Sequence, residues 1–511
     1  MTDFWLRPLS RCHRLILFGV AVFLFAWPLI LADHLYLDDN LRALSGGMTW
    51  QESGVTWQES GMTWQESGRL WVELFYQGLS FSSGTPDVFP LPLVLAMVLF
   101  VCALDTLVMH LFQRSTAATC LVVLPLWYSP FFLQNLSYHY DGPTTAFGVA
   151  AAIYAITFRH RSMILRQAVA GLLMALGLGF YQMVINVYIG LCCVELIREV
   201  DRNLSLRRSL LLLLDQCLKL TLGVLIYVLT AYQFTVAERK ALRVLDGDWL
   251  RLLSNDLLTC VQHMALLVHD GNRWLIALVL ALAVCGFYLS LYRVFKSDNT
   301  FFQRLMLSLI CLIALAVAFL AIPGLALVFR FFDSNARLMM GMSTFLVLVF
   351  YLSRNVLVLG GEKWGLLLLL PLLAMLAFSY AYGRVLTLQK ELENSVVHYL
   401  SYELITNERL SGIEHVQMVN NFSNDWYGGA EGAMRIMPAL RYVLNVHVLL
   451  QPELLSRSGV IVPFPPTQSF DWWGRQPQGE RLIENRFYSV YLQDKTAVVV
   501  MKDISADGRV R

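Results

Sequence analysis

Residues 14–33 have the sequence RLILFGVAVFLFAWPLILAD, and an acid pair, Asp38 and Asp39, follows after four further residues. The apolar run is long enough to cross about 30 Å of hydrocarbon as a helix. A basic flank at residues 7–14 precedes it without a small-residue cleavage site, so the run predicts a retained anchor rather than a signal peptide. We therefore expect a cytoplasmic N-terminus, with the acid pair on the outer side of the membrane.

Similar apolar runs recur along most of the chain. Of 511 residues, 57% are hydrophobic and 15% are charged, and the mean hydropathy is +0.55. This composition predicts a polytopic membrane protein whose spanning part is all-α, with about eleven transmembrane helices. We place them at residues 14–33, 91–112, 118–133, 143–158, 165–180, 183–197, 209–233, 274–292, 305–328, 338–353 and 364–383.

Composition also excludes some classes of function. The net charge is only +2 and no basic tail is present, which argues against a nucleic-acid partner. Most of the nine cysteines fall in apolar runs, so no disulfide framework is indicated.

Basic residues are distributed unevenly between the two sides of this arrangement. Arginine and lysine gather in the predicted inner loops, whereas the outer loops at 134–142 and 181–186 contain neither. The remaining outer loops are placed at about 34–89, 234–273 and 329–338. An odd number of spans then puts the C-terminal region outside.

The last part of the chain has a different pattern. We predict a transmembrane domain over residues 1–384 and a small outer α+β domain over 385–511. Within the second domain, residues 385–411 favour a helix, and Phe487–Lys502 favours two strands around a turn at 493–495. The Trp-rich piece at 470–475 is more typical of a structural corner than of a sugar-stacking site.

A seven-residue repeat lengthens the first outer loop. Its copies are Thr49–Gly54, Thr56–Gly61 and Thr63–Gly68. On a helix, the tryptophans at seven-residue spacing would form one stripe suited to membrane headgroups. The glycine in each copy disfavours a helix. A tandem duplication in a tolerant loop is therefore the favoured origin, with the tryptophans still expected at the membrane surface.

The acid pair is the first candidate catalytic group. A carboxylate outside the hydrocarbon can accept a proton from an acceptor hydroxyl while a lipid-linked substrate stays in the membrane. Two neighbouring carboxylates raise the pKa of one of them, which suits a base. Asp38 and Asp39 are both candidates, with Asp39 slightly preferred. The alternative is that one of them caps a short helix near Asn40, with Arg42 as its neutralising partner.

Two other outer groups add candidate binding residues. Tyr138, His139 and Asp141 lie in a polar cluster, where aromatic rings and a carboxylate suit sugar recognition. Asp141 could instead cap the span that begins at Pro143. Arg330 and Arg337 are suited to gripping a lipid phosphate, or alternatively to anchoring a span at the headgroups.

Four motifs together resemble a known family. They are Tyr36-Leu37-Asp38-Asp39 after the first span, Trp64 to Arg69, Pro130 to Asp141, and Tyr181-Gln182 with Asn186. Their order is similar to that of the serotype-converting O-antigen glucosyltransferases of the Gtr type II family, over roughly residues 30–350. Residues 130–141 are the most specific part of this resemblance.

The resemblance implies a GT-C-like, polytopic enzyme of the bacterial inner membrane. Such an enzyme would move glucose from undecaprenyl-phosphate-glucose to O-antigen polysaccharide of lipopolysaccharide on the periplasmic face, with inversion at the anomeric carbon. A flippase and a carrier-charging glucosyltransferase would act in the same pathway. The resemblance matches Asp38 and Asp39 to the family's acid pair, Asp141 to its Tyr-x-Asp and Arg69 to its Gly-Arg, and so adds Arg69 to the substrate-binding candidates. Arg42, close to the acid pair in sequence, is a further substrate-binding candidate. The inserted repeats directly before Arg69 depart from the family pattern, so its position stays open.

Cofactor use and two other functions also stay open. No cofactor is implied with certainty, and a divalent metal held by the acids is possible. An O-antigen polymerase or ligase, or another lipid-linked-sugar glycosyltransferase, would also be polytopic. The polymerase or ligase would favour a large, arginine-rich outer loop late in the membrane region. A transporter or flippase is less expected, because no internal repeat of spans or pair of broken helices is evident.

Overall fold

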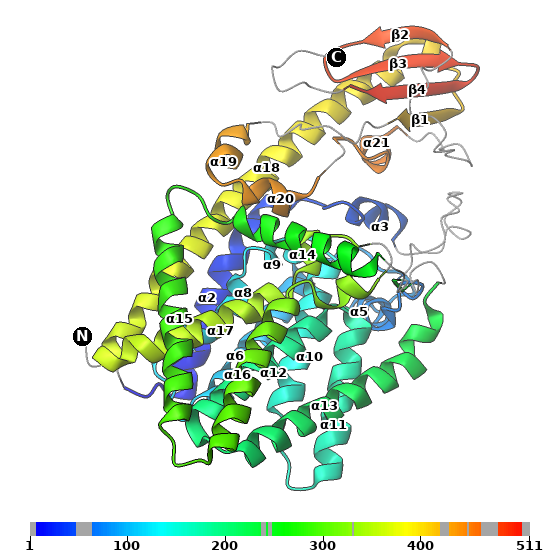
Figure 1. Ribbon diagram of the computed structural model, residues 1–511. Coiled ribbons are helices and arrows are strands. Elements are labelled where there is room, and N and C mark those ends of the chain that lie inside the picture. Colours follow the sequence, from blue (N-terminus) through cyan, green and yellow to red (C-terminus); the bar gives the residue numbers. More distant parts are fainter. Residues whose placement is uncertain are drawn as a thin grey trace.

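The computed structural model describes residues 7–46, 64–236, 242–243, 248–329, 332–419, 429–446, 449–460 and 479–502. These residues form a helical bundle that one long helix, α18, connects to a small sheet (Figure 1). The α-helices are α2 (Arg11–Ala32), α3 (Asp39–Ser45), α5 (Leu70–Ser80), α6 (Leu91–Leu111), α7 (Ala117–Val123), α8 (Pro125–Tyr128), α9 (Phe132–Ser137), α10 (Asp141–Thr157), α11 (Met163–Phe180), α12 (Val184–Asn203), α13 (Leu206–Leu229), α14 (Trp249–Ala265), α15 (Arg273–Phe295), α16 (Phe301–Leu320), α17 (Gly341–Leu357), α18 (Leu369–Thr406), α19 (Glu431–Ile436), α20 (Ala439–Leu444) and α21 (Glu453–Arg457).

Short 3₁₀ segments and four strands complete the described elements. The 3₁₀ segments are η1 (Ala231–Phe234), η3 (Gly324–Val328), η4 (Ala336–Leu338), η5 (Val358–Gly360), η6 (Glu362–Leu368) and η7 (Glu408–Leu410). The strands are β1 (His415–Val419), β2 (Glu480–Glu484), β3 (Tyr488–Gln493) and β4 (Thr496–Met501), in the order β1-β4-β3-β2.

Eight helices of the described chain are long and apolar enough to cross a membrane. They are α2, α6, α11, α13, α15, α16, α17 with η5, and η6 with α18. The other predicted spans correspond to α7–α9, α10 and α12. Of these, α10 has only 17 residues, and α12 ends in a run of charged residues. The prediction of a polytopic, mostly helical membrane protein is confirmed, and the predicted number of eleven spans is not.

The apolar run at 118–133 does not form the single predicted span. It is divided into α7, α8 and the start of α9, with breaks next to Pro125 and Pro130. Proline lacks the N–H that would continue a helix, and its ring disfavours a helical residue before it. Apolar content alone therefore overestimated the length of this helix.

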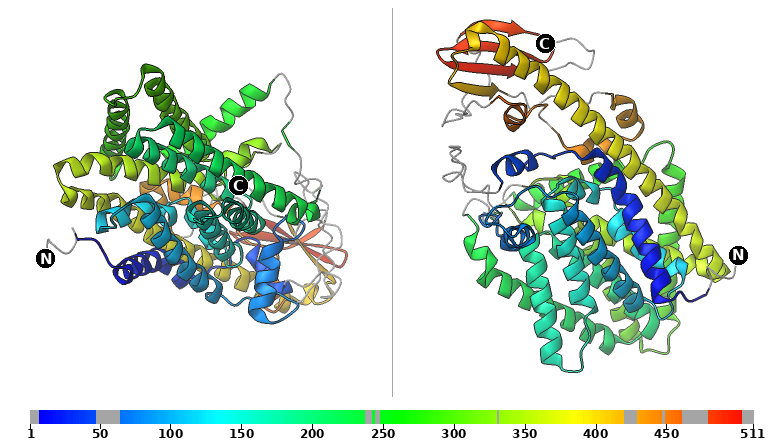
Figure 2. Two further views of the ribbon diagram at one scale, coloured as in Figure 1. Left: turned by 90° about the horizontal axis from the view of Figure 1, so that it is seen from below. Right: turned by 180° about the vertical axis from the view of Figure 1, so that it is seen from behind.

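The first and last long helices lie side by side, although their sequences are far apart (Figure 2). Gly383 of α18 permits this contact, because a Cβ atom there would lie 2.4 Å from the Cβ of Pro28. Ser379 donates a hydrogen bond to the Phe25 carbonyl at 2.6 Å. Small residues at a helix contact allow close backbone approach within a membrane. The α2–α18 pair therefore fixes the start of the C-terminal region against the first helix.

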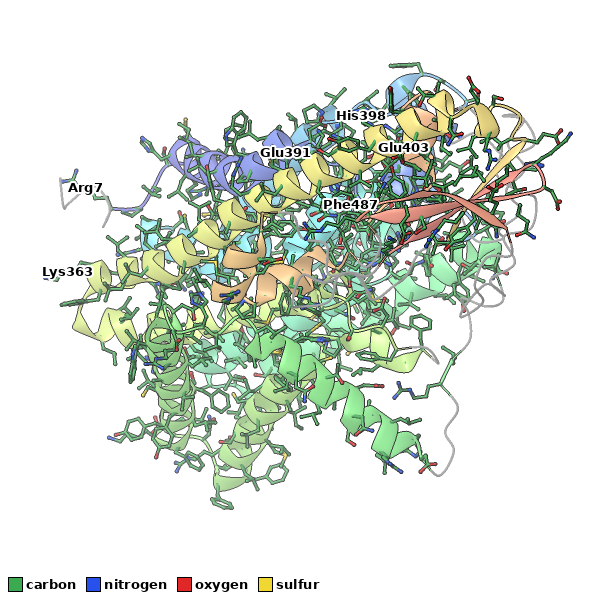
Figure 3. The ribbon with its side chains drawn as sticks, turned by 90° about the horizontal axis from the view of Figure 1, so that it is seen from above. Arg7, Lys363, Glu391, His398, Glu403 and Phe487 are labelled. Carbon is green, nitrogen blue, oxygen red and sulfur yellow. The ribbon has the colours of Figure 1, made fainter. Side chains whose placement is uncertain are left out.

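Helix α18 spans 38 residues, or about 57 Å at 1.5 Å per residue. It continues without interruption through residue 384, so the predicted domain boundary falls within a helix. Figure 3 shows Lys363 near one end of the molecule and Glu403 beside the sheet at the other. The predicted strand pair is confirmed, because β3 and β4 pair antiparallel around the turn at Asp494.

Candidate active site

Four segments that are distant in sequence meet at the end of the bundle where α2 finishes. They are the start of α3, the turn before α5, the segment from α9 into α10, and η4. Together they bring eight of the nine predicted site residues into one region. The ninth, Arg330, lies outside the described residues.

Asp39 is fully enclosed and joins two of these segments. Its Oδ2 accepts a hydrogen bond from the His139 N–H at 2.7 Å and from the Tyr36 N–H at 3.3 Å. Its Oδ1 has no hydrogen bond within the described chain and lies 4.0 Å from Arg42 Nη1. Burial raises the pKa of Asp39 well above its usual value, and Arg42 opposes the rise. This carboxyl holds the loop before α3 against the segment before α10.

Asp38 differs from its neighbour in accessibility. Its side chain is 55% exposed, and its Oδ2 lies 3.8 Å from Arg42 Nη2. It occupies the N-cap position of α3 but makes no side-chain capping bond. Of the two carboxylates, Asp38 is therefore the one that a bound substrate can reach. The capping alternative is not supported for either acid.

Asp141 is bound tightly by cationic and aromatic partners. Its Oδ1 accepts a hydrogen bond from Trp64 Nε1 at 2.7 Å, and its Oδ2 lies 3.3 Å from a nitrogen of Arg42 and of Arg69. The two guanidiniums lower the pKa of Asp141 to about 2 despite burial. Asp141 is the first residue of α10 and does not occupy the cap position. It is thus a permanent anion that organises two arginines.

Arg42 connects all three carboxylates of the site. It contacts Asp38, Asp39 and Asp141 within 4.0 Å, and its guanidinium lies over the Trp64 ring at 4.7 Å. Its side chain is 16% exposed. The sequence suggested Arg42 only as the partner of one capping acid, whereas in the structure its guanidinium lies near all three carboxylates.

The turn that carries Arg69 depends on a glycine. Gly68 has φ +71, and a Cβ atom there would lie 2.5 Å from Thr235 Oγ1 and 2.7 Å from the Tyr227 hydroxyl. The Tyr227 hydroxyl donates to the Gly68 carbonyl at 3.2 Å, and Gln182 donates to the Ser67 carbonyl at 2.6 Å. Only glycine fits this conformation and close approach. Arg69 is therefore held at the site despite the inserted repeats.

The tryptophan repeat is described only from Trp64 onward. The first two repeats lie outside the described residues. Trp64 is 5% exposed and packs against Tyr76 and Tyr140. Our expectation that it lies on the membrane surface was wrong. Its indole instead donates to Asp141, because the following Gly68 turn directs it into the site.

Arg337 approaches the site from the 3₁₀ segment η4. Its Nη1 donates to the Tyr138 hydroxyl at 2.8 Å, and its backbone N–H donates to Gln134 Oε1 at 2.7 Å. Burial opposes the charge of this guanidinium, but the neighbouring Tyr138 and Tyr181, together with Asp38 and Asp141, raise its pKa. Arg337 therefore stays cationic.

His139 reaches the site through its backbone rather than its ring. The ring is 4% exposed and stacks on Phe89, with centroids 3.7 Å apart and planes 4° apart. Its Nδ1 lies 3.8 Å from Asp87 Oδ2. This packing orients the N–H that binds Asp39 and leaves little of the ring for a substrate.

Residues after α18 contact the loop that carries the acid pair. The Asn40 amide donates to Gln451 Oε1 at 2.8 Å, and Arg457 donates to Asn40 Oδ1 at 3.2 Å. The Tyr36 hydroxyl donates to the Leu444 carbonyl. Segments α20 and α21 thus support the acid pair from outside the bundle.

The buried carboxyls predict opposite effects of pH on stability. The pKa of Asp141 is lowered from 3.8 to about 2, which stabilises the fold by about 2 kcal/mol at neutral pH. This contribution is present above about pH 4 and is lost as the pH falls towards 2. We expect Asp141→Asn to lower the unfolding temperature in detergent at pH 7, with a smaller difference from wild type below pH 4.

Asp39→Asn is the matched control. Because the pKa of Asp39 is raised, its ionisation destabilises the fold above pH 3.8, and the asparagine still accepts both backbone hydrogen bonds. Its unfolding temperature should not fall at pH 7. A loss of stability for Asp141→Asn that is equal at pH 3 and pH 7 would contradict the assigned charge state.

The acids do not fit a shared divalent cation. Among the described residues, no group of three or more His, Cys, Asp or Glu side chains is placed to hold a metal ion. Asp141 is neutralised by two guanidiniums, and Asp39 is directed towards backbone N–H groups.

Three residues that contact the site were not among the nine predicted site residues. Trp64 had one usable signal, because it is the repeat copy directly followed by Gly68-Arg69. Asn40 follows the acid pair, and an amide there suits hydrogen bonds in two directions. Arg457 gave no signal, since it contacts Asn40 from 417 residues away.

Comparisons with known proteins identify a family for most of the membrane region. A family model described as "Glucosyl transferase GtrII" matches residues 27–348, a range that includes all nine predicted site residues. An uncharacterized 55.3 kDa protein in the gtrB 5′ region of Salmonella phage P22 is 24% identical over 197 residues. That alignment covers 39% of this chain and 38% of the phage protein. No solved structure matches significantly.

Proposed function

This chain belongs to the family of GtrII glucosyl transferases, and from this premise we propose that it glucosylates O-antigen polysaccharide. The donor is a glucosyl, or another hexosyl, group on undecaprenyl phosphate. The reaction takes place on the periplasmic face of the bacterial inner membrane, the side that the basic residues before α2 predict for the acid pair. A flippase and a carrier-charging glucosyltransferase supply the donor to that face.

One observation supports this proposal most strongly. An exposed carboxylate, Asp38, lies 3.8 Å from Arg42, and Arg42 and Arg69 both contact Asp141 at the end of a membrane-type bundle. Arg337 is near enough for the charges of Asp38 and Asp141 to raise its pKa. Glycosyl transfer from a lipid phosphate needs a base for the acceptor hydroxyl and positive charge for the departing phosphate. This group of residues supplies both.

In the proposed reaction, Asp38 takes the proton of an acceptor sugar hydroxyl. The hydroxyl oxygen forms a bond to the anomeric carbon of the donor as the bond from that carbon to the phosphate oxygen breaks. Undecaprenyl phosphate leaves with the bonding electrons, stabilised by Arg337, and the configuration at the anomeric carbon inverts. Asp39 and Asp141 position the surrounding arginines and loops and do not exchange protons.

The test is a transfer assay on the full chain in nanodiscs. Purified protein is mixed with synthetic undecaprenyl-phosphate-glucose and O-antigen polysaccharide, and the product is analysed by mass spectrometry. We expect one added hexose mass per modified repeat unit. A change in polysaccharide length without added hexose would indicate a polymerase or ligase instead. Movement of the donor between leaflets without product would favour a transporter.

A further inference from the structure

An apolar groove lies beside the end of the bundle that carries the acid pair. It has a volume of about 580 Å³ and is formed by α14, α15, α17 and α18. Representative lining residues are Val261, Met264, Val279, Leu346, Ala374 and Phe378. The groove is far less polar than a site for a sugar would be.

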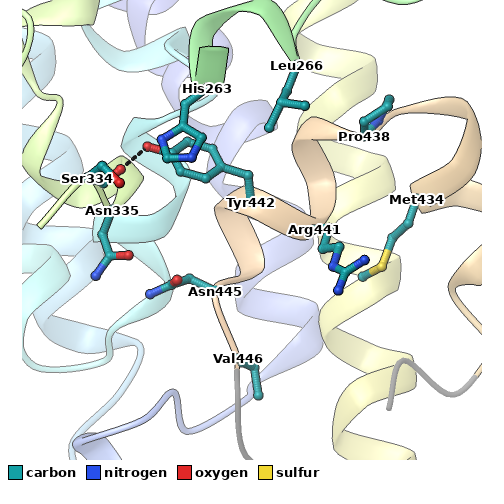
Figure 4. A pocket seen from close by; sticks show the side chains of 10 residues that line it. All are labelled: His263, Leu266, Ser334, Asn335, Met434, Pro438, Arg441, Tyr442, Asn445 and Val446. Atoms are coloured by element: carbon teal, nitrogen blue, oxygen red, sulfur yellow. Dashed lines mark hydrogen bonds between the residues drawn. The ribbon is translucent and has the colours of Figure 1, made fainter. Parts of the chain in front are cut away.

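Helix α14 covers this groove, and it lies across the end of the bundle (Figure 1). Val261, Met264 and Ala265 line the groove, whereas His263 and Leu266 line a separate cavity of about 590 Å³. Figure 4 shows this more polar cavity, where the His263 ring stacks on Tyr442. Residues at these spacings face opposite sides of a helix. The helix thus separates an apolar space from a more polar one.

The groove is open on the side that faces away from the helical bundle. Val268 and Leu280 remain 44% and 47% exposed, and α15 has the lowest buried share of the eight candidate spans, at 17%. An apolar surface of this kind within candidate spans faces hydrocarbon chains rather than water. A long hydrocarbon chain can therefore enter from the side, between α15 and α18.

One lining residue of the groove is close in sequence to the candidate active site. Pro130 lines the groove and begins the segment that contains Gln134 and Tyr138. Gln134 binds the backbone of Arg337 at 2.7 Å, and Tyr138 accepts from its side chain at 2.8 Å. A chain held in the groove would accordingly present its head group near Arg337.

A second apolar cavity lacks this connection. It has a volume of about 690 Å³ and is lined by Leu9, His13, Ala21 and Leu373 among others. His13 precedes Asp33 by 20 residues along α2, a rise of about 30 Å. This cavity therefore lies mainly towards the opposite end of α2 from the acid pair, and it serves as an internal comparison.

We infer that the groove under α14 binds the isoprenoid chain of the lipid-linked donor during transfer. The inference rests on the proposed function and adds where the carrier chain lies. A donor whose chain lies in this groove would have its phosphate near Arg337, while the chain stays in hydrocarbon. A phospholipid acyl chain has similar chemistry, and the test below separates it from the donor chain.

The experiment compares two substitutions of the same kind. Ala374→Trp fills the groove under α14, and Ala21→Trp fills the second cavity; both alanines are half-buried. Each full-length variant is assayed in nanodiscs with an undecaprenyl-linked donor and with a short-chain donor of two isoprene units. We expect Ala374→Trp to raise KM for the long donor by about tenfold or more, which corresponds to about 1.4 kcal/mol. KM for the short donor, and both KM values of Ala21→Trp, should change less than about threefold.

Photo-crosslinking on the unmodified protein gives an independent readout. An undecaprenyl phosphate with a diazirine at the end of its chain should label peptides of α15, α17 or α18 around the groove. Excess undecaprenyl phosphate should suppress the labelling, and excess phospholipid should not. Labelling of the second cavity, suppression by phospholipid, or equal KM changes for both donors would overturn the inference.

The two proposals fail in different ways. If wild-type protein transfers sugar but Ala374→Trp behaves like Ala21→Trp and the groove is not labelled, only the groove assignment fails. If wild-type protein transfers from neither donor, the proposed function fails. In that case, labelling of the groove would still show that it binds an isoprenoid chain.

Discussion

Replacing Asp38 with asparagine is expected to reduce kcat by about 10²–10⁴-fold, the usual contribution of a general base. The carboxylate is 55% exposed and makes no capping bond, so its loss should leave the fold intact. KM for the donor should change little, because the positive charge of Arg337 is retained. Initial rates from the nanodisc assay, together with the unfolding temperature, separate lost chemistry from lost structure.

Asp39→Asn is the control for this prediction. Asparagine retains an oxygen that accepts from the His139 and Tyr36 N–H groups, and a fully enclosed side chain is poorly placed to contact an acceptor hydroxyl. We expect its kcat to remain within about tenfold of wild type. If Asp39→Asn abolishes transfer in a stable protein while Asp38→Asn stays active, the roles proposed for the two acids are reversed.

The second large effect is expected for Arg337→Gln. Removing a preorganised charge that faces a leaving group reduces kcat by about 10²–10³-fold. Glutamine fills part of the same space and is uncharged. Arg337→Lys should recover part of the rate, because it restores the positive charge without the planar fork of donors. Single-turnover rates at saturating donor are the appropriate measurement, since they report the chemical step.

Tyr138→Phe tests whether the charge of Arg337 or its fixed position matters more. This change removes the 2.8 Å hydrogen bond from the guanidinium and keeps the ring that packs against Tyr36. We expect a loss of about fivefold to tenfold in kcat, since one hydrogen bond is removed and no charge. A loss for Arg337→Gln that is confined to KM for the acceptor would contradict a role in phosphate departure.

Local sequence signals were sufficient for several features. The apolar runs identified the membrane-type helices, and the alternating residues of 487–502 identified β3 and β4. The segment from Gln134 to Asp141 was also recognisable, because several polar residues between two apolar runs are costly unless they bind each other or a ligand. These features depend on neighbouring residues, which a single sequence displays directly.

The remaining features depend on tertiary contacts. Asp38 and Asp39 are chemically identical neighbours, and only their packing makes one exposed and the other enclosed. The sequence preference for Asp39 as base had no information about burial. Pro125 and Pro130 interrupt the apolar run at 118–133, but the prediction of a single span there rested on apolar content and not on these prolines. The α2–α18 contact joins helices more than 300 residues apart, as the bond from Ser379 to Phe25 illustrates.

The contacts of Tyr36 and Asn40 with the region after α18 have a consequence for biosynthesis. Tyr36 binds a carbonyl 408 residues later in the chain, and Asn40 binds Gln451 and Arg457. A ribosome adds roughly 5–20 residues per second, so the loop with the acid pair waits at least about 20 s for these partners. The nascent membrane helices are then complete before the loop acquires its final supports. Chains that stop before residue 444 would lack all of these supports, so we expect them not to consume the lipid carrier.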